Sequence, residues 1–232
     1  MYDIIKFWDE EIVSQHIRIS EVINFFTNIK KKNINYIDIG ANVGKVYDKL
    51  NSTIGVNKCF LVEPCRELAD YMRKKYSNLN NIKVIEKGVT KENKMFEFIN
   101  SAHYQTEEIG KEKNLNLGLS RISGKLEASG ENYLIEGITG CKLLEEEIDL
   151  EPSEIDYIKI DTENCDFFIL ENIFSYIKEN NIRPFISFEC NFMFFMTKDD
   201  AKKIIQPYFD ELNYKFIDLD TIQTSDLDLI PS

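Results

Sequence analysis

The sequence predicts an α/β fold in which a mostly parallel β-sheet is covered by helices on both faces. Strand-like and helix-like segments alternate along the chain, and the strand-like runs are apolar at consecutive positions. Runs that are apolar on both faces are typical of strands buried in a doubly wound parallel sheet. The 232 residues, of which 43% are hydrophobic, are enough for the core of one domain spanning residues 1–232.

The first part of the predicted sheet follows an N-terminal helical segment. Residues 1–33 carry apolar side chains at helical spacing and end in three lysines, which suit the negative end of a helix dipole. The alternation then predicts strands at 34–39, 57–64 and 82–89, with helices at 43–50 and 66–76.

The same rhythm resumes after residue 150. It predicts strands at 155–160, 185–189 and 214–219, with helices at 166–178 and 198–212. Residues 90–150 break the alternation, because they are polar and glycine-bearing, with extended stretches expected at 95–99 and 133–144. We therefore expect an insert of short strands and loops between the third and fourth parallel strands.

Composition excludes several classes of protein. The chain has 40 acidic and 28 basic residues and a net charge of -12, which argues against nucleic acid as its main partner. No apolar run approaches the roughly 18 to 20 residues of a membrane span, and the acidic N-terminus does not resemble a signal peptide. Five scattered cysteines without a C-x-x-C pair predict reduced thiols. A cytoplasmic protein is expected.

The strongest local signal is the segment YIDIGANVG, residues 36–44. A strand that carries Asp38 leads into a turn with Gly40 and Gly44, where the missing side chains let the backbone approach a ligand closely. The next strand ends at Glu63, nineteen residues after Gly44, where an acid can accept hydrogen bonds from both ribose hydroxyls. The turn and the acid together predict a cofactor that contains a nucleoside.

The spacing of the glycines distinguishes two such cofactors. The pattern Asp-x-Gly-x-x-x-Gly lacks the G-x-G pair of the dinucleotide fingerprint. A phosphate site has no use for the carboxylate of Asp38, whereas a ligand with an ammonium and a sulfonium group does. S-adenosylmethionine is therefore favoured over NAD, and an NAD-dependent oxidoreductase or epimerase is the alternative.

Four blocks of the sequence resemble the FkbM-type methyltransferases. They are DIGANVG at 38–44, VEP at 62–64, IDYIKIDTE at 155–163 and PFISFE at 184–189, in the order that the family has them. The resemblance implies a class I methyltransferase fold, Rossmann-like, with a seven-stranded sheet whose last strand is antiparallel. It also implies O-methylation of a hydroxyl on a sugar, a glycan or a small metabolite. One departure is Asn164, where the family has glycine, and a non-catalytic interaction module is a further alternative.

The resemblance further implies which residues bind S-adenosylmethionine. The methionine end would be held by five residues of the first block: Asp38, Gly40, Ala41, Asn42 and Gly44. Glu63 would hold the ribose, and Asp161 would lie near the sulfonium. Three residues that follow the third strand would lie beside the adenine: Glu86, Lys87 and Gly88.

Methyl transfer from a sulfonium is an in-line displacement, so the protein mainly aligns the acceptor oxygen with the methyl carbon. A carboxylate or histidine within about 3 Å assists the loss of the acceptor's proton. The candidates for this base are Glu163 and Glu189, near the ends of adjacent central strands, and His103 in the insert, with Asp161 also considered.

The acceptor is expected to be a small molecule or a glycan, with the insert at 90–150 as a lid over it. Within this insert, residues 116–123 are polar, and Arg121 would meet a carboxylate or phosphate on the acceptor. Metal-independent transfer is expected, with a divalent ion on Asp161, Glu189 and Asn191 as the alternative. The sequence names neither the acceptor nor the oligomeric state.

Overall fold

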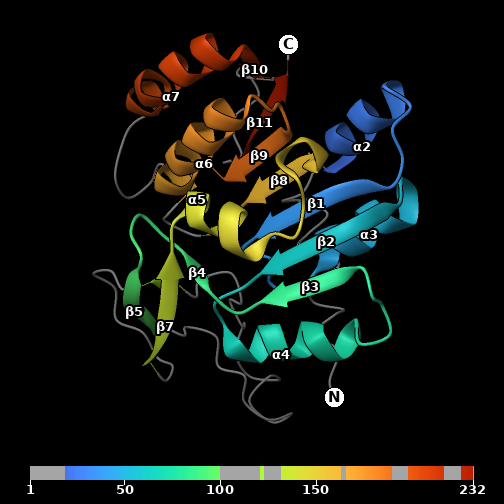
Figure 1. The fold of residues 1–232 in the computed structure, drawn as a ribbon, viewed down its shortest axis with the longest axis vertical. Coiled ribbons are helices and arrows are strands. Elements are labelled where there is room, and N and C mark those ends of the chain that lie inside the picture. The colour runs from blue at the N-terminus through green and yellow to red at the C-terminus, as the bar shows by residue number, and fades with distance from the viewer. Residues whose placement is uncertain are drawn as a thin grey trace.

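The computed structural model describes residues 19–99, 121–122, 132–162, 166–189, 198–216 and 226–231. Within them, a seven-stranded sheet has the order β10-β11-β9-β8-β1-β2-β3 (Figure 1). Its strands are β1 (Ile34–Ile39), β2 (Val56–Val62), β3 (Ile82–Ile85), β8 (Tyr157–Ile160), β9 (Phe185–Glu189), β10 (Tyr214–Phe216) and β11 (Asp226–Pro231). The pairs β3-β2, β2-β1, β1-β8 and β8-β9 are parallel, whereas β11 is antiparallel to both β9 and β10. The predicted α/β fold with a mostly parallel central sheet is confirmed.

Helices pack on both faces of this sheet because alternate strand residues point to opposite sides. They are α2 (Ile19–Asn28), α3 (Lys45–Thr53), α4 (Arg66–Lys75), α6 (Asp166–Asn180) and α7 (Lys198–Leu212). One face, with Ile37 and Ile158, packs against α6 and α7. The other face, with Tyr36 and Tyr157, packs against α2, α3 and α4. None of the helices in the described ranges is long and apolar enough to span a bilayer.

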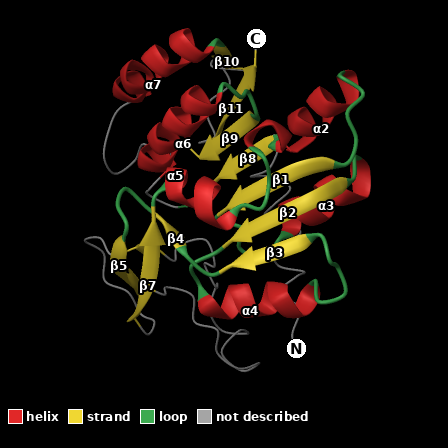
Figure 2. Cartoon of the chain, in the orientation of Figure 1, coloured by secondary structure: helices red, strands yellow, loops and turns green. Residues whose placement is uncertain are grey.

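A second sheet lies beside the carboxyl ends of β1, β2 and β3 (Figure 2). It contains β4 (Gly88–Val89), β5 (Lys94–Ile99), β6 (Arg121–Ile122) and β7 (Asn132–Ile138), in the order β4-β7-β5-β6. In the sequence these strands come between β3 and β8. Phe98 of β5 and Ile135 of β7 are buried side chains of this sheet, and they pack together with Leu68 of α4.

The predictions for two segments near this second sheet are wrong. The segment 82–89, predicted as one strand, is two strands, because β3 ends at Ile85 and Gly88 already pairs with Gly137 of β7. The segment 133–144 is extended only as far as Ile138. The Thr139 side chain then accepts a hydrogen bond from the backbone N–H of Lys142 and begins the short helix α5 (Gly140–Lys142). A π-helical turn follows at Leu143–Glu147.

Candidate cofactor site

The glycine turn between β1 and α3 lies against the carboxyl end of β8. Gly40 has φ +81°, and a Cβ at this position would lie 1.7 Å from the backbone oxygen of Asp161. Gly44, the N-cap of α3, has φ +77°, and a Cβ there would lie 2.4 Å from the Tyr76 hydroxyl. Both positions therefore require glycine. Asn42 between them has φ +52°, a conformation that asparagine tolerates better than most residues.

Lys159 connects this turn to the acids at the ends of β1 and β8. Its Nζ lies 3.1 Å from Asp38 Oδ1, 3.2 Å from Asp161 Oδ2 and 3.3 Å from the Gly40 carbonyl oxygen. The Asp38 side chain is 0% exposed, whereas that of Asp161 is 32% exposed. Burial raises the pKa of Asp38, and the attraction of Lys159 acts against this shift. Burial disfavours the charged form of Lys159, but Asp161 and Asp38 outweigh this and raise its pKa.

Glu63 joins the glycine turn to the turn that precedes α4. Its side chain accepts the Asn42 backbone N–H on Oε2 at 2.8 Å and the Cys65 backbone N–H on Oε1 at 2.9 Å. The residue is 6% exposed, and burial raises its pKa to about 7 although both N–H groups lower it. A carboxylate has about four acceptor positions, so each oxygen retains capacity for a ligand hydroxyl.

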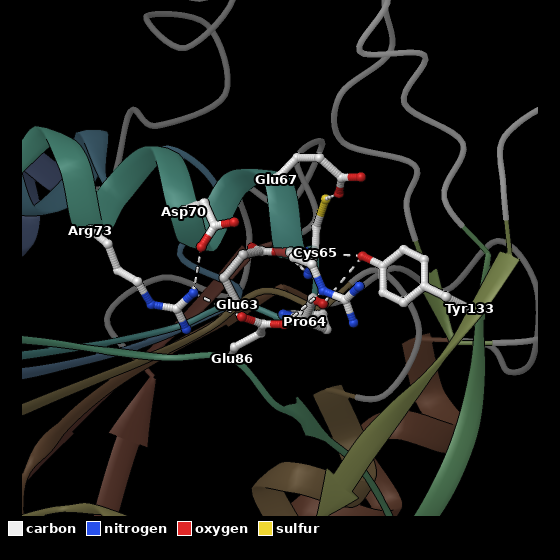
Figure 3. Close-up of polar contacts among 9 residues, drawn as sticks. Glu63, Pro64, Cys65, Glu67, Asp70, Arg73, Glu86 and Tyr133 are labelled. Carbon is white, nitrogen blue, oxygen red and sulfur yellow. Dashed lines mark hydrogen bonds and ion pairs between the residues drawn. The ribbon is translucent and has the colours of Figure 1, made fainter.

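The structure places the three residues predicted beside the adenine in different surroundings. The Glu86 side chain lies near Arg66 Nε at 3.2 Å and Arg73 Nη1 at 2.8 Å, next to the end of β2 (Figure 3). Lys87 pairs with Glu136 at 3.0 Å and with Glu147 at 2.8 Å. Gly88 is buried as the first residue of β4. The charges of Glu86 and Lys87 are therefore engaged in ion pairs with neighbouring side chains.

Tyr133 of β7 contacts the same turn from the second sheet (Figure 3). Its hydroxyl accepts the Arg66 backbone N–H at 2.9 Å and lies 3.5 Å from the Pro64 carbonyl oxygen. The Arg66 guanidinium carbon lies 5.2 Å from the centre of the Tyr133 ring. The sequence did not identify Tyr133 as part of the site; its only signal is an aromatic residue at an inward position of an alternating strand.

Asp166, at the start of α6, closes the turn after β8. It accepts the Thr162 backbone N–H on Oδ1 at 2.9 Å, and the residue is 4% exposed. Burial, followed by the repulsion of Asp161, raises the pKa of Asp166 to about 7. Sequence reasoning missed both Asp166 and Lys159 as parts of the site. The available signal for Lys159 was a lysine within the otherwise apolar strand YIKI.

Asn42 Oδ1 is a buried side-chain oxygen without a hydrogen-bond partner in the described part of the chain. The Tyr36 hydroxyl, by contrast, interacts with Asp38, and the Thr162 hydroxyl interacts with Asp166. Buried polar atoms normally have partners. Asn42 belongs to the glycine turn, at the edge where ligands of open α/β sheets bind, so its oxygen fits a polar ligand at that edge.

The structure describes the predicted bases to different extents. Glu163 and His103 lie outside the described residues, as do Asn164 and Asn191. Glu189 ends β9, and only its backbone is described, paired with Asp226. Arg121 is likewise described only as backbone in β6, and residues 116–120 are outside the described ranges. The described residues contain no cluster of three or more His, Cys, Asp or Glu suited to a metal.

Comparison with known proteins adds a family to this geometry. The methyltransferase FkbM domain model matches residues 38–216, from the glycine turn to β10. Among solved structures, methyltransferase FkbM from Methylobacillus flagellatus KT is 13% identical with a TM-score of 0.52, and the match covers 85% of this chain and 43% of that one. The chain thus spans less than half of that protein.

Two further structures are similar over most of this chain. The METTL16 methyltransferase domain is 13% identical (TM-score 0.49, covering 92% of this chain and 65% of that one). The human methyltransferase 10 domain containing protein is 11% identical (TM-score 0.49, covering 94% and 83%). No curated protein matches the chain. Since the family model covers well over half of the residues, the chain belongs to the FkbM methyltransferase family.

Proposed function

We propose that this protein transfers a methyl group from S-adenosylmethionine to a hydroxyl of a sugar, a glycan or a hydroxylated small metabolite in the cytoplasm. Family membership supports methyl transfer over the NAD-dependent alternative. The observation that carries the choice of cofactor is the hydrogen bond between Glu63 and the Asn42 N–H, at 2.8 Å. This hydrogen bond connects Glu63, the acid expected at the ribose, directly to the glycine turn, which is expected at the methionine end.

The residues at this edge fit S-adenosylmethionine. Gly40 lacks the Cβ that would meet the end of β8, so the turn stays close to the neighbouring strand. The unpartnered oxygen of Asn42 in the glycine turn suits a ligand with an amino group or hydroxyls. When bound, the sulfonium of this cofactor supplies an activated methyl group.

The chain's own residues would bind and orient that cofactor. Asp38, Gly40, Ala41, Asn42 and Gly44 would hold the methionine end. Glu63 would hold the ribose and Asp161 would lie near the sulfonium. For the adenine, the proposal rests on the backbone at Glu86, Lys87 and Gly88, since the two charged side chains are engaged elsewhere.

The base is proposed among Glu163, Glu189 and His103. In the parallel pair β8-β9, Ile160 is opposite Phe188, so Glu189 directly follows the last pair and Glu163 follows three residues after Ile160. Glu189 therefore stands at the carboxyl edge of β9, where the acceptor would meet the cofactor, and Glu163 is close in sequence to the same edge at the end of β8. His103 belongs to the segment proposed as a lid at 90–150, and a metal-independent reaction is proposed.

A transfer assay tests this function. The protein is incubated with methyl-labelled S-adenosylmethionine and a panel of sugars, glycans and hydroxylated metabolites, and labelled products are identified by mass spectrometry. We expect a labelled methyl ether, and we expect Glu163→Gln or Glu189→Gln to lower kcat about 100-fold with a smaller change in the KM for the cofactor. Glu179→Gln, at an exposed position of α6, is the matched control. Hydride transfer with NAD, or label on nitrogen or carbon only, would contradict the proposal.

A further inference from the structure

Lys159 occupies an unusual position for a lysine. It lies within β8 between Ile158 and Ile160, which are both 0% exposed, and it is itself 8% exposed. An ammonium group has three N–H donors, and three oxygens lie within 3.3 Å of Nζ. They belong to Asp38, Asp161 and the Gly40 backbone. The ammonium therefore has one oxygen of the proposed cofactor site for each of its three N–H donors.

The charges around Asp38 explain what such a lysine can do. Asp161 and Glu63 carry the nearby negative charges, while Tyr36 and Cys59 are buried groups with raised pKa values. Lys159 carries the positive charge that faces Asp38 in the described residues. A buried carboxylate without a cation takes up a proton instead of remaining charged.

We propose that Lys159 is a positioning residue for the cofactor, which keeps Asp38 ionised and holds Asp38 and Asp161, with the Gly40 carbonyl, around the methionine end. This inference rests on the proposed function and adds a residue that the family resemblance did not assign. Two carboxylates and one ammonium leave a net charge of about −1, so the edge still attracts a cationic amino group. The lysine thereby sets both the charge and the geometry of that end.

The test compares the affinity for S-adenosylhomocysteine at two pH values. Lys159→Met keeps the length of the side chain but removes the charge, so Asp38 should take up a proton as the pH falls. We expect the variant to bind about 3-fold more weakly than wild type at pH 8.5 and at least about 30-fold more weakly at pH 6, measured by calorimetry. Lys159 also lowers the pKa of Glu63, so in the variant both carboxylates take up protons more readily, and the ratio of the two dissociation constants reports their joint loss of charge.

Lys58→Met is the matched control. Lys58 is a strand lysine on β2 that pairs with Asp149, and its loss changes the net charge equally without touching the site. The dissociation constant of Lys58→Met for S-adenosylhomocysteine should stay nearly equal to that of wild type at both pH values. An equal loss of affinity at pH 6 and pH 8.5 for Lys159→Met would show a merely structural lysine and overturn the inference, as would unchanged affinity.

A double variant covers the case in which Lys159→Met does not fold. Asp38→Asn/Lys159→Met removes both charges, which a buried site tolerates better than the loss of one. The double variant should fold and should bind S-adenosylhomocysteine at least about 10-fold more weakly than wild type. The ratio of the two dissociation constants should not depend on pH. Affinity equal to that of wild type would overturn the inference. If wild type itself binds no S-adenosylhomocysteine, the proposed function fails and this inference fails with it.

Discussion

The Glu63 carboxylate accepts hydrogen bonds from two separate turns of the backbone. Each oxygen accepts one N–H, from Asn42 or from Cys65, inside a site that is almost fully shielded from water. Two hydrogen bonds do not offset the cost of burial, and the pKa of Glu63 rises from 4.5 to about 7. The side chain that organises the predicted ribose site therefore titrates near neutral pH.

This raised pKa has a definite consequence for stability. The folded protein holds the Glu63 proton more tightly than the unfolded chain, so the contribution to stability is fully present below about pH 4.5 and is lost as the pH rises through about 7. Urea unfolding of wild type and Glu63→Gln should show the stability of wild type, relative to the variant, falling by about 2–3 kcal/mol between pH 5 and pH 8. The pKa of Asp166 is also raised to about 7, but Asp166 is present in both proteins, so its contribution cancels in the difference between their stabilities.

The control for this measurement is Glu92→Gln, which removes an exposed glutamate. The stability difference between wild type and this variant should be nearly constant over the same range. A constant difference for Glu63→Gln as well would contradict the account of Glu63, because it would mean that folding leaves the proton affinity of this carboxylate unchanged.

At the residue scale, the sequence predicted the parts of the site that are held by local chain geometry. The turn with Gly40 and Gly44, and an acid at Glu63, follow from spacing along two strands and the turns after them. Lys159 was missed because its role depends on the register between β1 and β8, which pairs Asp38 with Lys159. Nothing local in YIKI says which oxygens the ammonium will meet.

At the scale of elements, β7 and α4 meet where Tyr133 accepts the Arg66 N–H at 2.9 Å. Tyr133→Phe keeps the ring against Phe98 and under the guanidinium but removes the hydroxyl oxygen. We expect it to lower the free energy of unfolding by about 1 kcal/mol, the net value of one hydrogen bond. Chemical denaturation measures this loss.

Arg66→Ala provides the comparison, because it removes the guanidinium and leaves the backbone N–H that Tyr133 accepts. Tyr133→Ala should cost about 3 kcal/mol or more, since it also removes the packing against Phe98. If Tyr133→Phe were as stable as wild type, the hydrogen bond would contribute nothing to joining the second sheet to α4.

The elements themselves were largely predictable because hydrophobic period and turn residues specify them locally. The two errors have different causes. Between Ile85 and Gly88 the chain leaves one sheet and joins another through the charged pair Glu86 and Lys87, and the apolar residues on either side of this pair made 82–89 resemble one strand. After Ile138 the Thr139 cap begins helical turns whose leucines are buried, so their hydrophobicity resembled that of a strand.

At the scale of the whole molecule, the proposed site lies where the carboxyl ends of β1, β2 and β8 meet the second sheet (Figure 1). The shared architecture positions the cofactor end, whereas the choice of acceptor depends on loops that vary between proteins of one fold. This is the physical reason why the sequence predicts a donor and leaves the acceptor open.

Calorimetric titration of the folded wild-type chain with S-adenosylhomocysteine tests the central claim most directly. Measurements at 10 °C and 30 °C prevent a vanishing enthalpy at one temperature from hiding association, because burial of apolar surface changes the heat capacity. We predict saturable binding with about one site per chain, and no binding of NAD under the same conditions. Absence of binding at both temperatures, in protein shown to be folded by circular dichroism, would contradict the assignment of this edge to an adenosyl cofactor.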